Sequence, residues 1–207
     1  MNLKVKEPRI TKQFFDNIWD KKDSGFYVEI GAWEGTKKNS TVILELAGWK
    51  GVCIEASPLS YKKLEQNRKC KCLNVAVYDY DGEIDYALFP DRPEWNGIVE
   101  TYNDQHKKLL ESKNPRLGSR TSAQAEIVKI KCRRWNSLNL PTHIDYMQLD
   151  VEGAEIAILN NIDWSTQHID YICLEDNDND GTYQQYMTSL GYEPILKQKV
   201  DVLWKKI

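Results

Sequence analysis

Short apolar stretches alternate with amphipathic stretches along most of this chain. Five apolar runs of strand length are predicted to form a mainly parallel sheet, and they cover about residues 26–30, 51–55, 71–76, 146–149 and 171–174. Apolar positions at helical spacing predict helices over about residues 12–22, 41–47, 58–67, 156–159 and 182–190. Strands that alternate with helices indicate an α/β fold, with helices on both faces of the sheet.

Four further runs are predicted as antiparallel strands, and the last two of them form a terminal hairpin; they cover about residues 83–89, 126–132, 192–196 and 201–205. The segment Pro90–Ala125 is polar and punctuated by Pro and Gly, yet it carries aromatic and basic side chains. A connection of this length without strong periodicity is typical of a functional lid or of disorder. We expect one domain over residues 1–207, with a lid at about 90–125 that contains a short helix over 105–112.

Composition narrows the class of protein. The 207 residues, 41% of them hydrophobic, are enough for one domain with a full core. The formal net charge of −3 argues against a nucleic-acid partner held mainly by phosphate contacts. The 5 cysteines lack the paired spacing of a zinc site and favour a reducing compartment. The polar start of the chain and the absence of an apolar run near the roughly 18 residues of a membrane span predict a soluble, cytoplasmic protein without a signal peptide.

A carboxylate and two glycines follow the first predicted strand, in the run V-E-I-G-A-W-E-G of residues 28–35. Dinucleotide-binding folds have G-x-G-x-x-G at this point, so that backbone N–H groups hold a pyrophosphate. Here Glu29 at the strand end would repel a pyrophosphate. It suits a cationic ligand instead, such as the amino group or the sulfonium of S-adenosylmethionine. A turn that merely joins a strand to a helix has the same pattern of Gly31 and Gly35.

Further carboxylates end the later strands. Glu55 lies 20 positions after Gly35, where doubly wound folds have an acid that binds ribose hydroxyls; a solvated strand end is the alternative. Asp150 ends the fourth parallel strand, and Glu175 follows the fifth. Because the carboxyl ends of parallel strands meet at one edge of a sheet, we expect these acids and Glu29 to face the same crevice.

The block L-D-V-E-G-A-E of residues 149–155 is the most specific motif. With V-E-I-G-A-W-E-G, G-W-K-G-V-C-I-E-A-S-P-L-S-Y-K-K-L-E-Q-N and N-V-A-V-Y-D-Y-D-G-E, it resembles the FkbM family of S-adenosylmethionine-dependent methyltransferases, over about residues 25–196. The resemblance implies a Rossmann-like class I methyltransferase fold, whose seven-stranded sheet has an antiparallel hairpin at its edge. The chain departs from the family at Glu29, where Asp is common, and at Trp33, where a small or polar residue is common.

The resemblance also implies where the methyl donor binds. The glycine turn leaves room for the methionine part, the acid of the second strand binds the ribose, and the end of the third strand flanks the adenine. The implied donor-binding residues are Glu29, Gly31, Ala32, Trp33, Gly35, Ser40, Glu55, Ala56, Ser57, Ala76, Val77 and Asp150.

Methyl transfer to an aliphatic hydroxyl needs a base, or a metal that lowers the pKa of the hydroxyl. Hard oxygen ligands suited to Mg²⁺ or Mn²⁺ are offered by Asp150, Glu175, Asp176 and Asn177. Asp150, Asp176 and Asn177 are similar to the Asp…Asp-Asn arrangement of metal-dependent catechol O-methyltransferases, and Glu175 competes with Asp176 as the ligand. An acidic turn in water is the alternative. Asp150 is the first candidate for orienting or deprotonating the hydroxyl. Glu152 and His106 are further candidates, and Glu152 or Glu155 can instead cap the helix that follows.

The acceptor is predicted from the lid. Trp95 and Tyr102 suit stacking against the apolar face of a sugar ring, so we expect O-methylation of a sugar or glycan. A nucleic-acid methyltransferase acting on a cap or a ribose is an alternative, since base stacking can use the same aromatics. A nicotinamide-dependent oxidoreductase is disfavoured by Glu29 and Glu34. A non-catalytic protein that binds S-adenosylmethionine stays open.

Overall fold

The structure is a computed structural model, and it describes residues 24–37, 39–90, 92–111, 125–176 and 180–207. The helix predicted over residues 12–22 and residues 112–124 of the predicted lid lie outside the described part. Within the described part, no helix combines the length and the apolar character that crossing a membrane requires.

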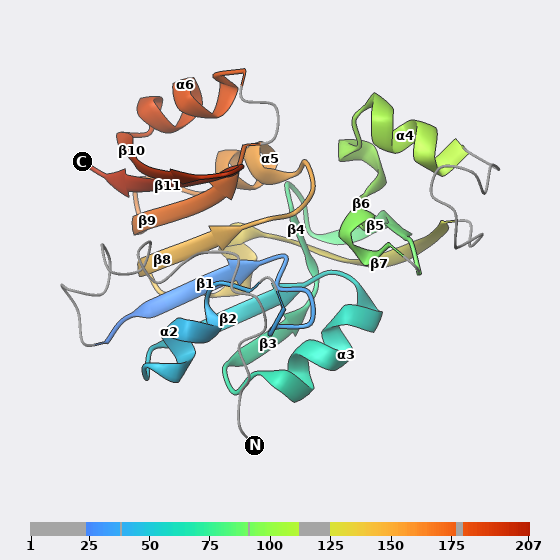
Figure 1. The fold of residues 1–207 in the computed structure, drawn as a ribbon, viewed down its shortest axis with the longest axis horizontal. Coiled ribbons are helices and arrows are strands. Elements are labelled where there is room, and N and C mark those ends of the chain that lie inside the picture. Colours follow the sequence, from blue (N-terminus) through green and yellow to red (C-terminus); the bar gives the residue numbers. More distant parts are fainter. Residues whose placement is uncertain (1–23, 38, 91, 112–124, 177–179) are drawn as a thin grey trace.

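The main sheet has the strand order β10-β11-β9-β8-β1-β2-β3 (Figure 1). Its strands are β1 (Phe26–Ile30), β2 (Lys50–Glu55), β3 (Lys71–Asn74), β8 (His143–Leu149), β9 (His168–Glu175), β10 (Tyr192–Gln198) and β11 (Asp201–Lys206). The strands from β9 to β3 run parallel, whereas β11 is antiparallel to both of its neighbours. The predicted α/β fold, with a mainly parallel seven-stranded sheet and an antiparallel terminal hairpin, is confirmed.

Helices cover both faces of this sheet because alternate residues of each strand point to opposite sides. Tyr27 of β1 packs in one cluster with Leu44 and Leu64, which come from the helices on that face. Its neighbour Val28 packs in a second cluster with Met187 from the other face. The helices on the first face are α2 (Val42–Leu46) and α3 (Pro58–Asn67), and those on the second are α5 (Glu155–Asn160) and α6 (Thr182–Ser189).

A second, smaller sheet has the order β4-β7-β5-β6. Its strands are β4 (Ala76–Tyr78), β5 (Gly82–Leu88), β6 (Gly97–Ile98) and β7 (Glu126–Arg134). The predicted antiparallel pairing of residues 83–89 with 126–132 is confirmed, since β5 and β7 pair antiparallel from Gly82↔Cys132 to Leu88↔Glu126. The single strand predicted over 71–76 is wrong, because the chain leaves the main sheet after Asn74 and enters the second sheet at Ala76.

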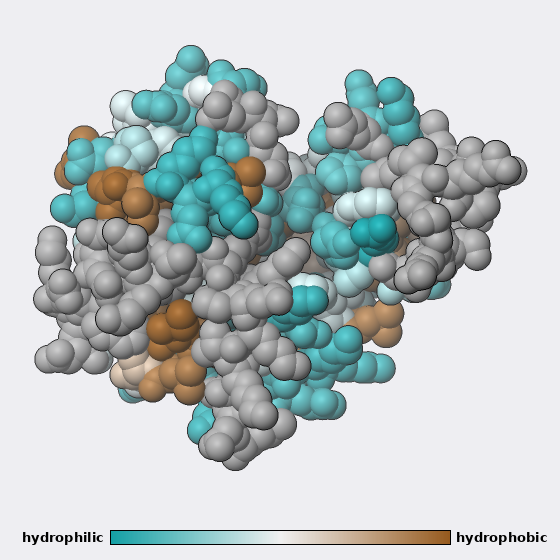
Figure 2. Space-filling model, viewed as in Figure 1, coloured by the Kyte–Doolittle hydropathy of each residue, from teal (hydrophilic) through white to brown (hydrophobic). Residues whose placement is uncertain are grey.

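The segment between β5 and β7 carries three of the remaining described helices. They are the 3₁₀ helices η1 (Pro93–Trp95) and η2 (Val99–Thr101) and the helix α4 (Asp104–Glu111); a further 3₁₀ helix, η3 (Trp135–Leu138), follows β7. Figure 1 shows α4 and the second sheet beside the main sheet, at the side to which β1 and β8 point. The surface is hollowed between α6 and α4 (Figure 2).

Candidate active site

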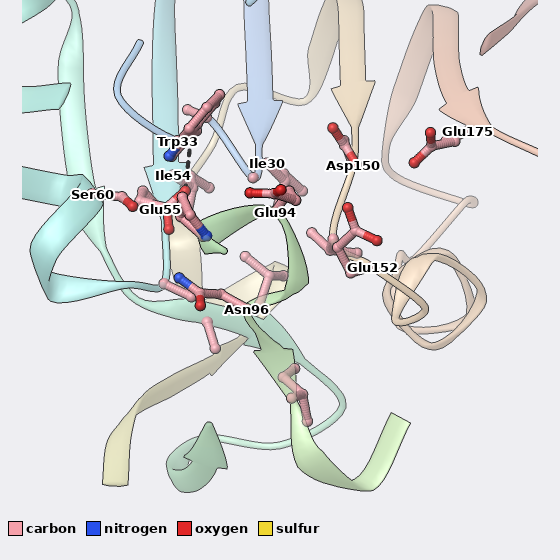
Figure 3. Close-up of a pocket in the computed structure, with 18 of the residues that line it drawn as sticks. Ile30, Trp33, Ile54, Glu55, Ser60, Glu94, Asn96, Asp150, Glu152 and Glu175 are labelled. Carbon is pink, nitrogen blue, oxygen red and sulfur yellow. Dashed lines mark hydrogen bonds between the residues drawn. The ribbon is translucent and has the colours of Figure 1, made fainter. Parts of the chain in front are cut away.

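A cavity of about 500 Å³ lies at the carboxyl ends of β1, β2, β8 and β9. Its other walls come from the segment between β5 and β6 and from the turn between β10 and β11. Figure 3 shows Glu55, Asp150 and Glu175 around this cavity, with Glu94 and Asn96 from the opposite wall. The structure thus brings the acids at three separate strand ends to one crevice, as expected when the carboxyl ends of parallel strands meet at one edge of a sheet.

The predicted site residues divide into two groups. Those that line the cavity are Gly31, Ala32, Trp33, Glu55, Ala56, Ala76, Val77, Asp150, Glu152 and Glu175. The predicted residues that are described but do not line it are Glu29, Gly35, Ser40, Ser57, Trp95, Tyr102, His106 and Asp176. Asn177 lies outside the described residues.

Gly31 is required by the close approach of two strand ends. Its φ of +81° is in the left-handed region, and a Cβ there would lie 1.7 Å from the carbonyl oxygen of Asp150. The backbone N–H of Asp150 donates to the carbonyl of Ile30 at 3.1 Å, and the N–H of Gly31 donates to the carbonyl of Ile54 at 3.0 Å. The glycine therefore lets the ends of β1 and β8 approach each other closely at the floor of the cavity.

Glu55 is oriented by two backbone groups. Its Oε2 accepts from the N–H of Trp33 at 2.7 Å, and its Oε1 accepts from the N–H of Ser57 at 2.8 Å. The backbone of Trp33 has a φ of 47° where its N–H donates to Glu55, and residues with bulky side chains rarely adopt this conformation. Burial raises the pKa of Glu55 to about 7. Each carboxylate oxygen of Glu55 keeps a further lone pair that can accept a hydrogen bond from a ligand. Ser57 does not line the cavity, but its backbone N–H helps to position Glu55.

Glu29 has a different environment from the one we predicted. Its carboxylate lies 3.4 Å from Nη1 of Arg68, in a pair whose side chains are almost completely buried. It also accepts hydrogen bonds from Asn39 Nδ2 at 2.7 Å and from the hydroxyl of Thr41. Its negative charge is balanced inside the protein, so the prediction that Glu29 faces a cationic ligand is corrected.

Gly35 also has a packing role. Its φ is +77°, and a Cβ there would lie 2.6 Å from Leu64 and 2.7 Å from Arg68. Its carbonyl accepts from Nη1 of Arg68 at 3.4 Å. The second glycine of the motif therefore makes room for α3 and for the Arg68 side chain, and it does not line the cavity.

Three carboxylates meet at the ends of β8 and β9. Oxygens of Asp150, Glu152 and Glu175 lie within 4.8 Å of one another. Asp176, which was predicted as a metal ligand with Glu175 as its competitor, is outside this group. Glu155 caps its own helical turn: its carboxylate accepts from the N–H groups of Val151 and Gly153 and from a tyrosine hydroxyl. Of the two glutamates that follow Asp150, it is thus Glu152 that lines the cavity.

A family model described as "Methyltransferase FkbM domain" matches residues 29–194. The chain belongs to the FkbM methyltransferase family. The strand ends described above form a crevice of the kind in which open parallel α/β sheets hold their ligands.

The other comparisons found only distant likenesses. No curated protein matches this FkbM methyltransferase. Among solved structures it is similar to the METTL16 methyltransferase domain, with a TM-score of 0.46 and 9% identity over 93% of this chain and 64% of that one, so it spans less than two thirds of that domain. It is also similar to M. capricolum TrmK in complex with S-adenosylhomocysteine, with a TM-score of 0.45 and 9% identity over 96% of this chain and 69% of that one. A methyltransferase from Methanosarcina mazei has a TM-score of 0.42 and 9% identity over 96% and 98% of the two chains.

The cavity of this FkbM methyltransferase is strongly acidic. Among the described residues, the acids that line it are Glu55, Glu94, Asp150, Glu152, Glu175 and Asp201. Lys199, in the turn between β10 and β11, is the only basic side chain among the described lining residues. Such a surface favours cationic and hydroxyl-bearing ligands over phosphate groups.

The lid aromatics are engaged with each other. Tyr102 is buried and donates its hydroxyl to the carbonyl of Trp95, while the ring of Trp95 packs edge-on against Phe89 at 5.8 Å. The ring of His106 lies 5.0 Å from that of Tyr102, and burial lowers the pKa of His106. None of Trp95, Tyr102 and His106 lines the cavity, which corrects their predicted roles as stacking surface and base. The aromatic residues that do line it are Trp33 and Tyr86.

Sequence reasoning missed the wall opposite the strand ends. Glu94 and Asn96 belong to the predicted lid but were passed over for its aromatics. Asn96 is fixed because its Oδ1 accepts from the N–H of Phe89 at 2.7 Å. Lys199 and Asp201 belong to the terminal hairpin, which carried no recognised motif. The signal that could have found them is topological, since β11 lies beside β9, whose end carries Glu175.

Proposed function

We propose that this protein transfers the methyl group of S-adenosylmethionine to a hydroxyl of a sugar or glycan. The observation that supports this most directly is the meeting of three carboxylates, from Asp150, Glu152 and Glu175, beside the glycine turn. A hydroxyl acceptor must lose a proton when its oxygen is methylated, and carboxylates are suitable groups to orient it and accept that proton.

For the donor, we propose that the ribose hydroxyls donate to Glu55, whose oxygens are already oriented by backbone N–H groups. The methionine part would then lie over Gly31 and Ala32, and the adenine would lie against Ala56 and Ala76. The sulfonium is directed towards Asp150 in this arrangement. Acids around the donor stabilise its positive charge before transfer and hold the methyl group in line with the acceptor.

The reaction then consists of one displacement. The acceptor oxygen forms a bond to the methyl carbon as the bond from that carbon to sulfur breaks, and S-adenosylhomocysteine leaves as a neutral thioether. The hydroxyl proton passes to a carboxylate, for which we propose Asp150, with Glu152 as the neighbouring alternative. From there the proton returns to water.

The same carboxylates fit a divalent ion. Opposite ligands of an octahedral Mg²⁺ lie about 4 Å apart, which is compatible with oxygens that lie within 4.8 Å of one another. Asp150, Glu152 and Glu175 would hold the ion, with Mg²⁺ or Mn²⁺ preferred because all the ligands are oxygens. A bound ion would lower the pKa of the acceptor hydroxyl.

The acidic lining supports a neutral, polyhydroxylated acceptor over an RNA. Trp33 and Tyr86 take the place we first gave to the lid aromatics, as the apolar surfaces available to a sugar ring. Lys199 is available to contact a single anionic group on such an acceptor.

Incubation with S-[methyl-¹⁴C]adenosylmethionine and a panel of free sugars, nucleotide sugars, glycans, small phenols and RNA tests this proposal. We expect base-stable label on a sugar hydroxyl, and loss of turnover with retained S-adenosylhomocysteine binding in Asp150→Asn. Label found on RNA or on phenols alone would overturn the choice of acceptor. Donor binding without turnover on any acceptor, unchanged by Asp150→Asn, would indicate a non-catalytic binding protein.

A further inference from the structure

Two histidines and an aspartate gather at the edge of the main sheet opposite the cavity. His143 is the first residue of β8 and His168 is the first residue of β9, and the two are paired in register. Asp170 lies two positions after His168, so its side chain is on the same face of the strand. The proposed methyl transfer uses none of these three residues.

The three side chains are close enough to share one ion. Nε2 of His143 and Nε2 of His168 each lie 3.0 Å from Oδ1 of Asp170. The centroids of the two imidazole rings are 5.2 Å apart. The side chains are accessible, with exposed fractions of 52% for His143, 57% for His168 and 22% for Asp170.

The backbone around this cluster is held in place by hydrogen bonds between the two strand starts. The N–H of His168 donates to the carbonyl of Thr142 at 2.7 Å. Nε2 of Gln167 donates to the carbonyls of Pro141 and Thr142, and its Oε1 accepts from the indole N–H of Trp135 at 3.0 Å. The residues immediately before both histidines are therefore fixed, which preorganises the side chains that follow them.

We propose that His143, His168 and Asp170 form a binding site for Zn²⁺ or a similar divalent transition metal. Two imidazoles and one carboxylate are ligands that zinc prefers, and water can complete a tetrahedral shell. With metal–ligand bonds of about 2.0 Å, tetrahedral ligands lie about 3.3 Å apart. The 3.0 Å separations need to grow by only a few tenths of an ångström to meet this value.

Binding at this site would join the starts of β8 and β9. The other ends of the same two strands carry Asp150 and Glu175. A metal that binds the folded state and not the unfolded chain raises the midpoint of thermal unfolding. The site lies at the opposite ends of these strands from the three carboxylates of the cavity. It also differs in its preferred ion, because nitrogen ligands select Zn²⁺ over Mg²⁺.

Calorimetric titration of the EDTA-treated, dialysed protein with ZnCl₂ tests the proposal, with MgCl₂ titrated in parallel. We expect a Zn²⁺-binding event that His143→Ala, His168→Ala and Asp170→Asn each weaken at least tenfold. His106→Ala removes the chain's remaining histidine and should leave that event unchanged, as should Glu175→Gln in the cavity. MgCl₂ should not compete for it.

Imidazole ¹H–¹⁵N spectra of the unmutated protein give an independent readout. Addition of ZnCl₂ should shift the signals of His143 and His168 and leave those of His106 in place. The proposal is overturned if Zn²⁺ moves none of these signals, or if Zn²⁺ binding survives His143→Ala and His168→Ala but is lost in Glu175→Gln. In those cases the two histidines serve only as polar contacts of Asp170, and the proposed methyl transfer is unaffected.

Discussion

Arg68 and Glu29 form a buried ion pair, with Nη1 of the guanidinium 3.4 Å from the carboxylate. Nε of the same arginine lies 2.9 Å from the carboxylate of Glu45. Its Nη2 donates a hydrogen bond to the phenol oxygen of Tyr27 at 2.9 Å. Arg68 thus ties the end of α3 to β1, α2 and the glycine turn. Glu29, the acid of the first motif, therefore stabilises the framework that supports the proposed donor site.

Replacing Arg68 should destabilise the protein severely. Arg68→Met leaves the carboxylates of Glu29 and Glu45 buried without their cation, and loss of one partner of a buried pair typically costs about 3–5 kcal/mol. Urea unfolding followed by circular dichroism measures the change in free energy. Lys129→Met is the matched control, because Lys129 pairs with Asp85 at 2.8 Å on the exposed surface and should have little effect. Equal midpoints for the two variants would contradict the structural role given to Arg68.

Local patterns were sufficient for most of the fold. Residues 27–30 of β1 and 144–149 of β8 are all buried, as expected for parallel strands covered on both faces. The direction of the strands then brings Glu55, Asp150 and Glu175 to one edge whatever the detailed packing. These predictions rest on periodicity and on a general property of parallel sheets, so one sequence contains enough information for them.

Predictions that depended on distant partners failed. Nothing near Glu29 in the sequence reveals Arg68, which is 39 positions away. Residues 71–76 were predicted to form one strand, yet Ala76 pairs with Cys132 of the second sheet. Tyr102 is buried because Gly97 leaves space for its ring, where a Cβ would lie 2.5 Å from it. Each of these outcomes is set by tertiary contacts that hydrophobic periodicity does not encode.

Gly31 should tolerate no side chain. In Gly31→Ala the new Cβ would meet the carbonyl oxygen of Asp150 at 1.7 Å, so β1 and β8 must separate at the floor of the cavity. Gly48→Ala is the matched control: Gly48 also has a positive φ, of +94°, but its Cβ would have no neighbour within 4 Å. The control should lose about 1–2 kcal/mol from backbone strain alone.

The two glycine variants separate strain from collision. Gly31→Ala should lose clearly more unfolding free energy than Gly48→Ala in urea titrations. It should also lose S-adenosylhomocysteine binding in calorimetry under conditions where circular dichroism reports a folded protein. If both variants lose the same stability and both bind the ligand normally, the tight contact between Gly31 and Asp150 is not required for the site.

Glu55 should make donor binding depend on pH near neutrality. Burial raises its pKa to about 7 in the free protein, and the ionised carboxylate is the form that accepts two ribose hydroxyls. Binding therefore favours the ionised form, and affinity should fall as the pH drops below about 7. At pH 6 the loss should approach about tenfold, because each pH unit below the pKa lowers the ionised fraction about tenfold.

Calorimetric titrations with S-adenosylhomocysteine between pH 6 and pH 8.5 measure this dependence, and Glu55→Gln is its control. The variant should bind more weakly at pH 8 and lack the transition near pH 7. In the absence of ligand, the sign for stability is opposite: a raised pKa in the folded state means that the stabilising contribution of protonated Glu55 is lost as the pH rises through about 7. A transition that persists in Glu55→Gln would assign it to another group.

Glu175 and Asp176 provide a matched pair for the metal proposal, because they are neighbours of similar charge and only Glu175 joins Asp150 and Glu152 in the cavity. Glu175→Gln should raise the Mn²⁺ or Mg²⁺ concentration needed for half-maximal methyl transfer by about tenfold or more, since one charged ligand is lost. Asp176→Asn should leave that concentration unchanged. Activity is measured after EDTA treatment and stepwise return of the ion. Full turnover in EDTA would remove the metal from the proposal, and equal effects of the two substitutions would attribute them to the general charge of the loop instead of direct ligation by Glu175.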